Sequence, residues 1–281
     1  MSETFETRDG LTLVYELSGD GPLLVCHPGG PGFSARYLTR SLGGLDREFT
    51  LVLLDPRGTG ASEAPDDSSA YTTADYVGDV ESLREHLGEE RLNLLGHSHG
   101  GVVAVAYAAE HPKRVRRLVV ANSLARVLAD EMEPIMQMHE REPWYQDARE
   151  ALELESAGAY STPEELAALT DRFWPMYFAH FDDTARAYLR EYVRELPNTD
   201  ASKLFNDEID AGRFDLRPSL ARIEAPTLVI TGELDFICGP ACAADLSEIP
   251  GARTVVLDDC GHFTFVETPE RWRETVSRFL A

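Results

Sequence analysis

The sequence has few of the features that mark membrane, secreted or nucleic-acid-binding proteins. No apolar run in it reaches the roughly 18 residues that a membrane-spanning helix needs. Its start, MSETFETRDG, has neither the basic residues nor the apolar segment of a signal peptide. Only 26 Lys and Arg stand against 49 Asp and Glu, so the net charge is −23 and there is no basic patch. We therefore expect a cytoplasmic protein that binds neither nucleic acid nor an anionic membrane.

Cysteine is also scarce, and its spacing excludes the common zinc motifs. The four cysteines stand at positions 26, 238, 242 and 260, with no zinc-binding interval among them. Reduced thiols are the expectation for such a chain. Internal repeats and low-complexity tracts are absent as well. What is present is a chain of 281 residues, 43% of them hydrophobic, which suits one large α/β domain or a core with an insertion.

Short aliphatic runs alternate with amphipathic helical segments along most of the chain. The runs read LLVCH, FTLVLLD, LNLLGH, VRRLVVA, TLVITG and TVVLDD, a pattern typical of strands buried on both faces of a parallel sheet. Helical spacing is evident over 72–88, ending at Gly88, and over 268–280, with Thr268 as the N-cap. Near the start, FETRDG and LTLVYELSG predict two antiparallel edge strands. The fold class is therefore α/β, with a mostly parallel doubly wound sheet.

Residues 126–215 interrupt this alternation. The segment has no aliphatic strand run, and it holds 21 Asp and Glu against 9 Lys and Arg. We interpret it as a helical lid inserted into an α/β core formed by residues 1–125 and 216–281. Its aromatic residues, among them Trp174 and Tyr177, are candidates for contact with a substrate. The competing interpretation is that each aromatic residue only packs the interior of the lid.

The segment LLGHSHGG, residues 94–101, contains the pattern Gly-x-Ser-x-Gly between a strand run and a helix. That context predicts a nucleophile elbow, a tight turn that holds the Ser98 hydroxyl above the edge of the sheet. The alternative is a serine that only caps a helix. Neither flanking histidine is well placed as the base, because the neighbours of the nucleophile point away from its hydroxyl. We expect His97 to pack behind the elbow and His99 to offer its backbone N–H.

A base and an orienting carboxylate are found further along, in the order Ser, Asp, His. Asp235 ends the strand run of LVITGELD, and His262 follows that of VVLDDCGH. Both lie where open α/β sheets build their sites, at the carboxyl ends of strands. Asp258 and Asp259 compete for the carboxylate role, but they stand too close to His262 in sequence. We therefore predict a Ser98–His262–Asp235 triad.

Acyl transfer also needs N–H donors for the oxyanion that forms in the transition state. HPGGPG, residues 27–32, follows a strand run and can present a backbone N–H at the mouth of the site. Gly30 is the first choice for this donor and Gly29 the second, with the N–H of His99 as its partner. The chemistry needs no metal and no organic cofactor.

These motifs together resemble the α/β-hydrolase fold family, and within it the prolyl iminopeptidase-like branch of serine hydrolases. The resemblance rests on HPGGPG, on DPRGTGAS at 55–62, on GHSHGG at 96–101, and on GH followed by ETPERW near the end. It implies the same triad and an acyl-enzyme that releases an N-terminal proline. It also implies lid glutamates that bind the amine of the substrate. The sequence departs from the family at Pro28, where the branch has His, and at the two histidines of the elbow.

Three functions are compatible with this interpretation. The first is hydrolysis of an N-terminal proline or a similar small aminoacyl amide, with the amine held by Glu131 or Glu133, or by Asp182 or Asp183 further on. The second is an esterase, lactonase or amidase acting on a small metabolite in a pocket of lid aromatics. The third is a small-molecule receptor with a slow triad, which the complete set of catalytic motifs disfavours. In each case the partner is a small molecule or a short peptide.

Overall fold

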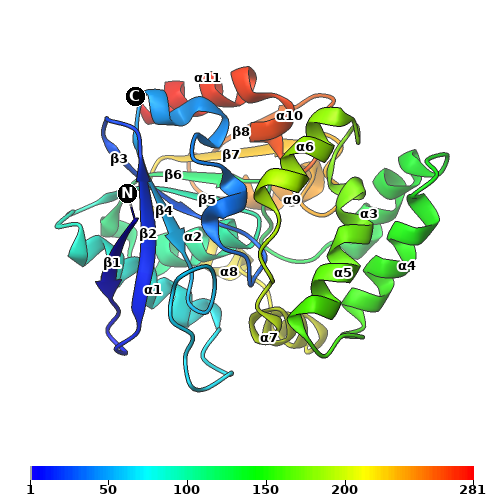
Figure 1. Ribbon diagram of the computed structural model, residues 1–281. Coiled ribbons are helices and arrows are strands. Elements are labelled where there is room, and N and C mark those ends of the chain that lie inside the picture. Colours follow the sequence, from blue (N-terminus) through cyan, green and yellow to red (C-terminus); the bar gives the residue numbers. More distant parts are fainter. Residues whose placement is uncertain (1) are drawn as a thin grey trace.

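The central feature of the computed structural model is a single twisted sheet (Figure 1). The structure describes residues 2–281, in which eight strands follow the order β1-β2-β4-β3-β5-β6-β7-β8. Their bounds are β1 Ser2–Glu6, β2 Thr12–Ser18, β3 Leu23–His27, β4 Thr50–Asp55, β5 Leu92–His97, β6 Val115–Ala121, β7 Thr227–Gly232 and β8 Arg253–Leu257. β2 pairs antiparallel with β1 and β4, and the other neighbours are parallel. The predicted fold class and its antiparallel edge are confirmed.

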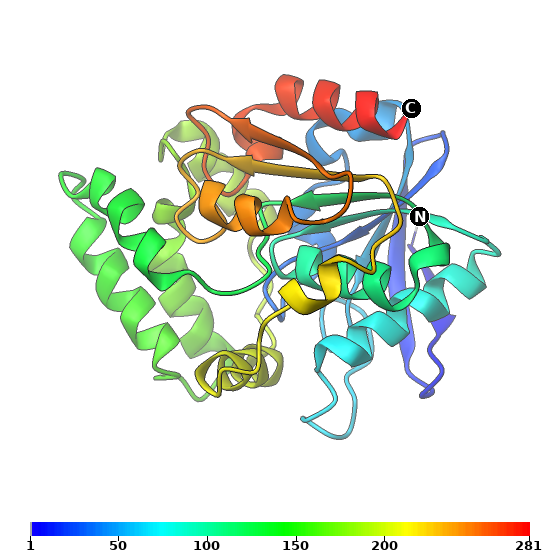
Figure 2. The same cartoon turned by 180° about the vertical axis from the view of Figure 1, so that it is seen from behind.

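Helices cover both faces of the sheet. One layer consists of α1 (Thr73–His86), α2 (His99–Glu110), α8 (Arg217–Leu220) and α9 (Pro240–Leu246), and the other of α10 (Thr264–Glu267) and α11 (Pro269–Leu280). Figure 2 shows α11 in red on the opposite side of the sheet from α1 in cyan. The two predicted helices therefore lie in different layers, which is the arrangement of a doubly wound sheet.

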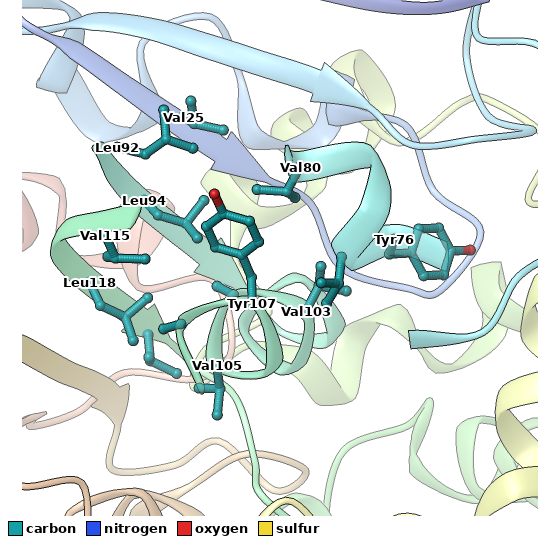
Figure 3. Packing of buried hydrophobic residues seen from close by; sticks show 14 of the residues in the cluster. Val25, Tyr76, Val80, Leu92, Leu94, Val103, Val105, Tyr107, Val115 and Leu118 are labelled. Atoms are coloured by element: carbon teal, nitrogen blue, oxygen red, sulfur yellow. The ribbon is translucent and has the colours of Figure 1, made fainter. Parts of the chain in front are cut away.

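Burial on both faces explains the unbroken aliphatic runs. Leu94 of β5 points into the cluster under α1 and α2, whereas its neighbour Leu95 points into the cluster under α11. Figure 3 shows the first cluster, where Tyr107 of α2 lies between the strand residues and Val80 of α1. Because successive residues of a strand point to opposite faces, apolar residues occupy most positions of the central strands.

The order of the strands reverses at β3. β3 pairs with β4 on one side and with β5 on the other. The chain therefore runs from β3 to one side of the sheet and, after β4, crosses back to the other side. Open α/β sheets bind their ligands at such a switch point.

Residues 126–215, which we call the lid segment, fill the gap between β6 and β7. All of them are described, and they contain no strand but five α-helices: α3 Ala129–Met136, α4 Tyr145–Ser156, α5 Pro163–Phe173, α6 Asp183–Tyr192 and α7 Thr199–Asp210. These helices lie beyond one end of the sheet (Figures 1 and 2). Tyr145, Leu166 and Phe173 form a small hydrophobic cluster of their own there. Among residues 2–281, no helix is long and apolar enough to cross a membrane.

Two helix ends can be compared with their sequence signals. α1 ends at His86, and Gly88 follows with a φ of 70°, the left-handed conformation that glycine favours after a helix. Thr268 does occupy the N-cap position of α11, but its hydroxyl donates to the carbonyl oxygen of Thr264 instead of capping the helix. The predicted N-cap position of Thr268 is confirmed, although its side chain forms no capping hydrogen bond.

A buried ion pair fixes the DPRGTGAS loop against α1. The Arg57 guanidinium donates two hydrogen bonds to the Asp79 carboxylate, at 2.8 and 2.6 Å. Both side chains are almost completely buried, and Nη1 of Arg57 also lies 3.1 Å from Asp9. A bidentate pair of this kind locks the loop, since neither charge can be left alone in the interior.

We expect Asp79→Ala to lower the free energy of unfolding by about 3 kcal/mol, because Arg57 loses its main partner inside the protein. Urea unfolding followed by circular dichroism measures this change. The double variant Arg57→Met/Asp79→Leu removes both charges and should recover much of the loss. If the single variant unfolds at the same urea concentration as the wild type, the pair does not stabilise the fold.

Candidate active site

Ser98 stands in a strained turn between β5 and α2. Its φ of 56° and ψ of −126° lie outside the regions that residues other than glycine usually adopt. A Cβ on Gly96 would lie 2.1 Å from the carbonyl oxygen of Gly100, so strand and helix can approach only without side chains there. The Ser98 side chain forms no capping hydrogen bond with α2. The turn has the geometry of a nucleophile elbow.

Asp235 and His262 meet beside this turn. Asp235 follows β7 and His262 follows β8, and Oδ2 of Asp235 lies 2.8 Å from Nδ1 of His262. The other carboxylate oxygen of Asp235 accepts the backbone N–H groups of Ile237 and Cys238, at 3.1 and 3.0 Å. Both side chains are buried. Asp235 is thus fixed from three directions, and the imidazole points its other nitrogen away from the carboxylate.

Asn122 is a further contact of this pair that the sequence analysis did not identify. It follows β6, and its Nδ2 donates to Oδ2 of Asp235 at 2.9 Å and to the carbonyl oxygen of Gly261 at 3.2 Å. Burial alone would raise the pKa of Asp235, but the neighbouring His262 and the Asn122 amide outweigh burial and hold the pKa below its ordinary value. Asp235 is therefore a carboxylate at neutral pH. The signal that was missed is a polar residue directly after an aliphatic strand run.

A cavity of about 580 Å³ lies between the sheet and the lid segment, and it is lined by Ser98 and His262 together with Gly30. Its wall is mostly apolar, and the aromatic residues in it are Phe33, Tyr37, Phe173, Trp174, Tyr177, Phe205 and Phe263. The predicted lid aromatics Trp174 and Tyr177 are among them. Tyr177 packs edge-on against the imidazole of His262, with ring centroids 5.1 Å apart. A cavity of this size and lining suits a small organic substrate.

The loop after β3 packs directly on the elbow. A Cβ on Gly29 would lie 2.6 Å from the Cβ of Ser98, so a side chain at this position would displace the nucleophile. The N–H of Gly29 donates to the hydroxyl of Tyr37, and Gly30 lines the cavity. Of the two predicted oxyanion donors, Gly30 is among the cavity-lining residues and Gly29 is not. His99 is the first residue of α2, where backbone N–H groups have no partner within the helix.

The two histidines of the elbow are both buried and neutral. His97 lies behind the turn, where burial lowers its pKa to about 3, and its ring contacts Tyr37 and the backbone of His262. The ring of His99 packs edge-on against Tyr76 and Phe205. Burial lowers the pKa of His99 to about 3 as well. Within residues 2–281, the base that lines the cavity with Ser98 and faces a carboxylate is His262.

The predicted amine-binding carboxylates differ in where they lie. Glu131 is exposed and outside the cavity lining, and Asp182 caps the N-terminus of α6. Glu133 lines the cavity, but its carboxylate pairs with Arg149 at 2.6 Å. Glu155 on α4 also lines the cavity, and the sequence analysis did not single it out. Nothing in the sequence distinguishes it from the other acidic residues of the lid segment.

Asp235, Cys238 and His262 offer three potential metal-ligand atoms within 4.8 Å of one another. The oxygens of Asp235 already accept hydrogen bonds from the other two residues. Burial raises the pKa of the Cys238 thiol well above its ordinary value, so the thiol keeps its proton. A metal would need the thiolate. We assign this cluster to the anchoring of Asp235.

Comparison with known proteins agrees with the geometry. Residues 22–269 match the family model described as the alpha/beta hydrolase fold. The proline iminopeptidase of Saccharolobus solfataricus is 26% identical over 100% of this chain and 92% of its own length. The proline iminopeptidase of Lactobacillus delbrueckii subsp. lactis is 28% identical, over 95% and 92% of the two lengths. A solved structure, the enol-lactonase from Burkholderia xenovorans LB400, superposes with a TM-score of 0.73 and 26% identity over 99% of both chains.

The matched residues include the elbow and the strand ends that carry Asp235, and the relatives cover nearly the whole chain. The resemblance drawn from four short motifs thus extends over the complete fold. The chain belongs to the α/β-hydrolase fold family, resembles its prolyl iminopeptidase-like branch, and is an enzyme of the serine hydrolase class.

Proposed function

We propose that the protein hydrolyses small aminoacyl amides, such as those with an N-terminal proline, through an acyl-enzyme on Ser98. The hydrolytic part rests on the strained elbow, the His262–Asp235 pair and the cavity that Ser98 and His262 share. The choice of an amine-bearing substrate rests on Glu155, a carboxylate in the cavity wall without a cationic partner. Relatives named as proline iminopeptidases support the same choice.

The proposed reaction follows from the protonation of the two ring nitrogens of His262. Nδ1 of His262 donates to Asp235, so Nε2 carries the lone pair that accepts the Ser98 proton. Oγ of Ser98 attacks the carbonyl carbon, and the N–H groups of Gly30 and His99 stabilise the resulting oxyanion. The imidazolium then protonates the leaving amine. Water repeats the sequence to release the acid, with His262 again as the base.

Glu155 carries the assignment of the substrate. It is half-buried on α4, and among residues 2–281 no Lys, Arg or His forms an ion pair with it. Burial raises the pKa of Glu155 above its ordinary value, and the Asn206 amide beside it opposes only part of that shift. A carboxylate left unpaired in an apolar cavity is stabilised when a ligand brings a cation. A substrate ammonium is such a cation.

The second candidate function is hydrolysis of a neutral ester or lactone. It is favoured by the apolar, aromatic wall of the cavity and by the similarity to an enol-lactonase. The same triad would serve both reactions, because acyl transfer to serine does not depend on the leaving group being an amine. The two candidates therefore differ in the use of Glu155 and not in the chemistry at Ser98.

Ser98→Ala and His262→Ala should each reduce kcat by about 10⁴ to 10⁶, because either change removes the activated nucleophile. Asp235→Asn should cost somewhat less, since Asp235 orients the imidazole without transferring a proton. Steady-state kinetics on prolyl p-nitroanilide and p-nitrophenyl acetate measure these losses. Labelling by a fluorophosphonate probe should occur in the wild type and disappear in Ser98→Ala.

His99→Ala serves as the control for this assignment, because His99 is not among the cavity-lining residues and Ala keeps its backbone N–H. Its loss should stay far below that of His262→Ala when circular dichroism shows the same fold. More than a few per cent of residual activity in Ser98→Ala would mean that another residue is the nucleophile.

Glu155→Gln should lower kcat/KM for prolyl and alanyl p-nitroanilides by about tenfold or more, which is about 1.4 kcal/mol. The effect should lie mainly in KM, since the ammonium contacts the carboxylate before and during the reaction. Glu133→Gln is the matched control. It lies on the same cavity wall, but Arg149 already neutralises it, so its effect should be within about twofold.

The same assignment predicts a pH dependence of substrate binding. Because the pKa of Glu155 is raised, the carboxylate becomes protonated at a higher pH than an exposed glutamate, and the ammonium then loses its partner. KM for aminoacyl amides should therefore rise as the pH falls through this raised pKa, and KM for p-nitrophenyl acetate should not. If Glu155→Gln affects amides and neutral esters equally, the ester or lactone hydrolase becomes the better function.

A further inference from the structure

A chain of hydrogen bonds crosses the site behind Ser98. It begins at the N–H of Gly29, which donates to the hydroxyl of Tyr37 at 2.5 Å. The Tyr37 hydroxyl lies 2.7 Å from Nδ1 of His97, and Nε2 of His97 lies 3.0 Å from the carbonyl oxygen of His262. The chain thus joins the loop after β3 to the loop after β8, and it passes directly under the nucleophile.

Only one arrangement of protons satisfies every member of this chain. The carbonyl oxygen of His262 can only accept, so Nε2 of His97 carries the hydrogen. Nδ1 of His97 then has a lone pair and accepts from the Tyr37 hydroxyl. The oxygen of Tyr37 in turn accepts from Gly29. Every hydrogen-bond donor in this series therefore points from the loop after β3 toward the loop after β8.

Burial keeps this arrangement fixed. Tyr37 and His97 are both buried, and burial raises the pKa of Tyr37 while it lowers the pKa of His97 to about 3. The charged groups nearby are His262, whose charge lowers the pKa of His97 further, and Asp235, which opposes that shift. His97 therefore stays neutral when His262 takes up its proton, although the two rings lie only 4.8 Å apart.

We infer that Tyr37 and His97 are positioning residues. They fix the loop after β3, which carries Gly30, relative to the loop after β8, which carries His262, on either side of Ser98. The Tyr37 hydroxyl accepts the N–H of Gly29, so this N–H is engaged, and the N–H of Gly30, a residue of the cavity wall, is left for the oxyanion. His97 accepts a hydrogen bond from the Tyr37 hydroxyl and donates one to the backbone carbonyl of His262. This inference rests on the proposed acyl transfer at Ser98, but it is independent of the substrate's amine.

The inference predicts a loss in kcat more than in KM. An oxyanion exists in the transition state and not in the bound substrate, so a misplaced donor weakens transition-state binding alone. Tyr37→Phe removes one hydroxyl and leaves the ring in place. We expect kcat to fall by about 10- to 100-fold, with KM within about twofold, since a complete loss of a donor costs about 10²- to 10³-fold. The rate of inactivation by a fluorophosphonate should fall by a similar factor.

Tyr107→Phe is the matched control for the loss of a buried hydroxyl. Tyr107 lies in the cluster under α1 and α2, on the other face of the sheet (Figure 3), where its hydroxyl donates to Glu81 at 2.7 Å. Neither residue is among those that line the cavity. Removal of the Tyr107 hydroxyl should lower the melting temperature as Tyr37→Phe does and leave kcat unchanged. If Tyr37→Phe lowers the melting temperature to the same extent but keeps kcat within twofold, Tyr37 is only structural and the inference is wrong.

Variants of His97 test whether the chain acts as a unit. His97→Gln can still donate toward the carbonyl of His262, and His97→Asn can still accept from Tyr37, so each keeps one link and breaks the other. Both should lose kcat as Tyr37→Phe does, and Tyr37→Phe/His97→Gln should lose no more than about threefold beyond the larger single loss. Full additivity of the two losses would overturn the inference. Unchanged kcat in both His97 variants would overturn it as well, and this test remains available if Tyr37→Phe does not fold.

Each loss should be measured on prolyl p-nitroanilide and on p-nitrophenyl acetate. The inference predicts the same factor of loss in kcat for both substrates, because any acyl substrate forms the oxyanion. Failure of the amine assignment would appear in the Glu155 variants alone, and failure of the nucleophile assignment in Ser98→Ala. Failure of the positioning role would appear in the Tyr37 and His97 variants while Ser98→Ala remains inactive.

Discussion

The close approach of three backbone segments beneath Ser98 is the constraint on which the site depends. β5 and α2 meet so tightly that Gly96 admits no side chain, and a Cβ on Gly100 would lie 2.2 Å from the carbonyl oxygen of His27. The loop after β3 is thereby pressed against the loop after β5. A cavity with a nucleophile and an N–H donor on the same wall can form only because both contacts are backbone to backbone.

Contacts with the lid segment hold His262, the base, at the cavity wall that carries Ser98. The N–H of His262 donates to the carbonyl oxygen of Tyr177 at 2.7 Å, and the Glu267 carboxylate accepts the N–H groups of Gly261 and Ala179. Burial raises the pKa of Glu267 to about 7, while the two N–H donors act in the opposite direction. The loop of the base and the adjacent part of the lid segment are thus held by the same backbone hydrogen bonds. The lid segment therefore supports the geometry of the base as well as covering the cavity.

The elements that could be predicted from the sequence are those with a local cause. Aliphatic runs revealed the strands because burial on both faces leaves few polar positions, and the elbow around Ser98 was marked by the glycines that its turn requires. Tyr37, Asn122 and Glu155 were not identified in this way, because their roles depend on parts of the chain that are distant in sequence. Tyr37 bonds to His97, 60 residues further on, and Asn122 bonds to Asp235, 113 residues further on. Glu155 stands out only because it lines the cavity. Thr268 occupies the predicted N-cap position, but the sequence did not reveal that its hydroxyl would bond to Thr264.

The charge of the lid segment illustrates why a composition does not locate a binding site. Its 21 acidic residues against 9 basic ones predict attraction of a cation, but they do not say where the cation would bind. In the cavity, Glu133 is neutralised by Arg149, so the count of carboxylates overstates the field that a ligand meets. Exposed carboxylates such as Glu131 are screened by water and salt within a Debye length, about 8 Å at physiological ionic strength. Selectivity for an amine would therefore depend on Glu155, which lines the cavity, is half-buried and has no cationic partner, and not on the net charge around it.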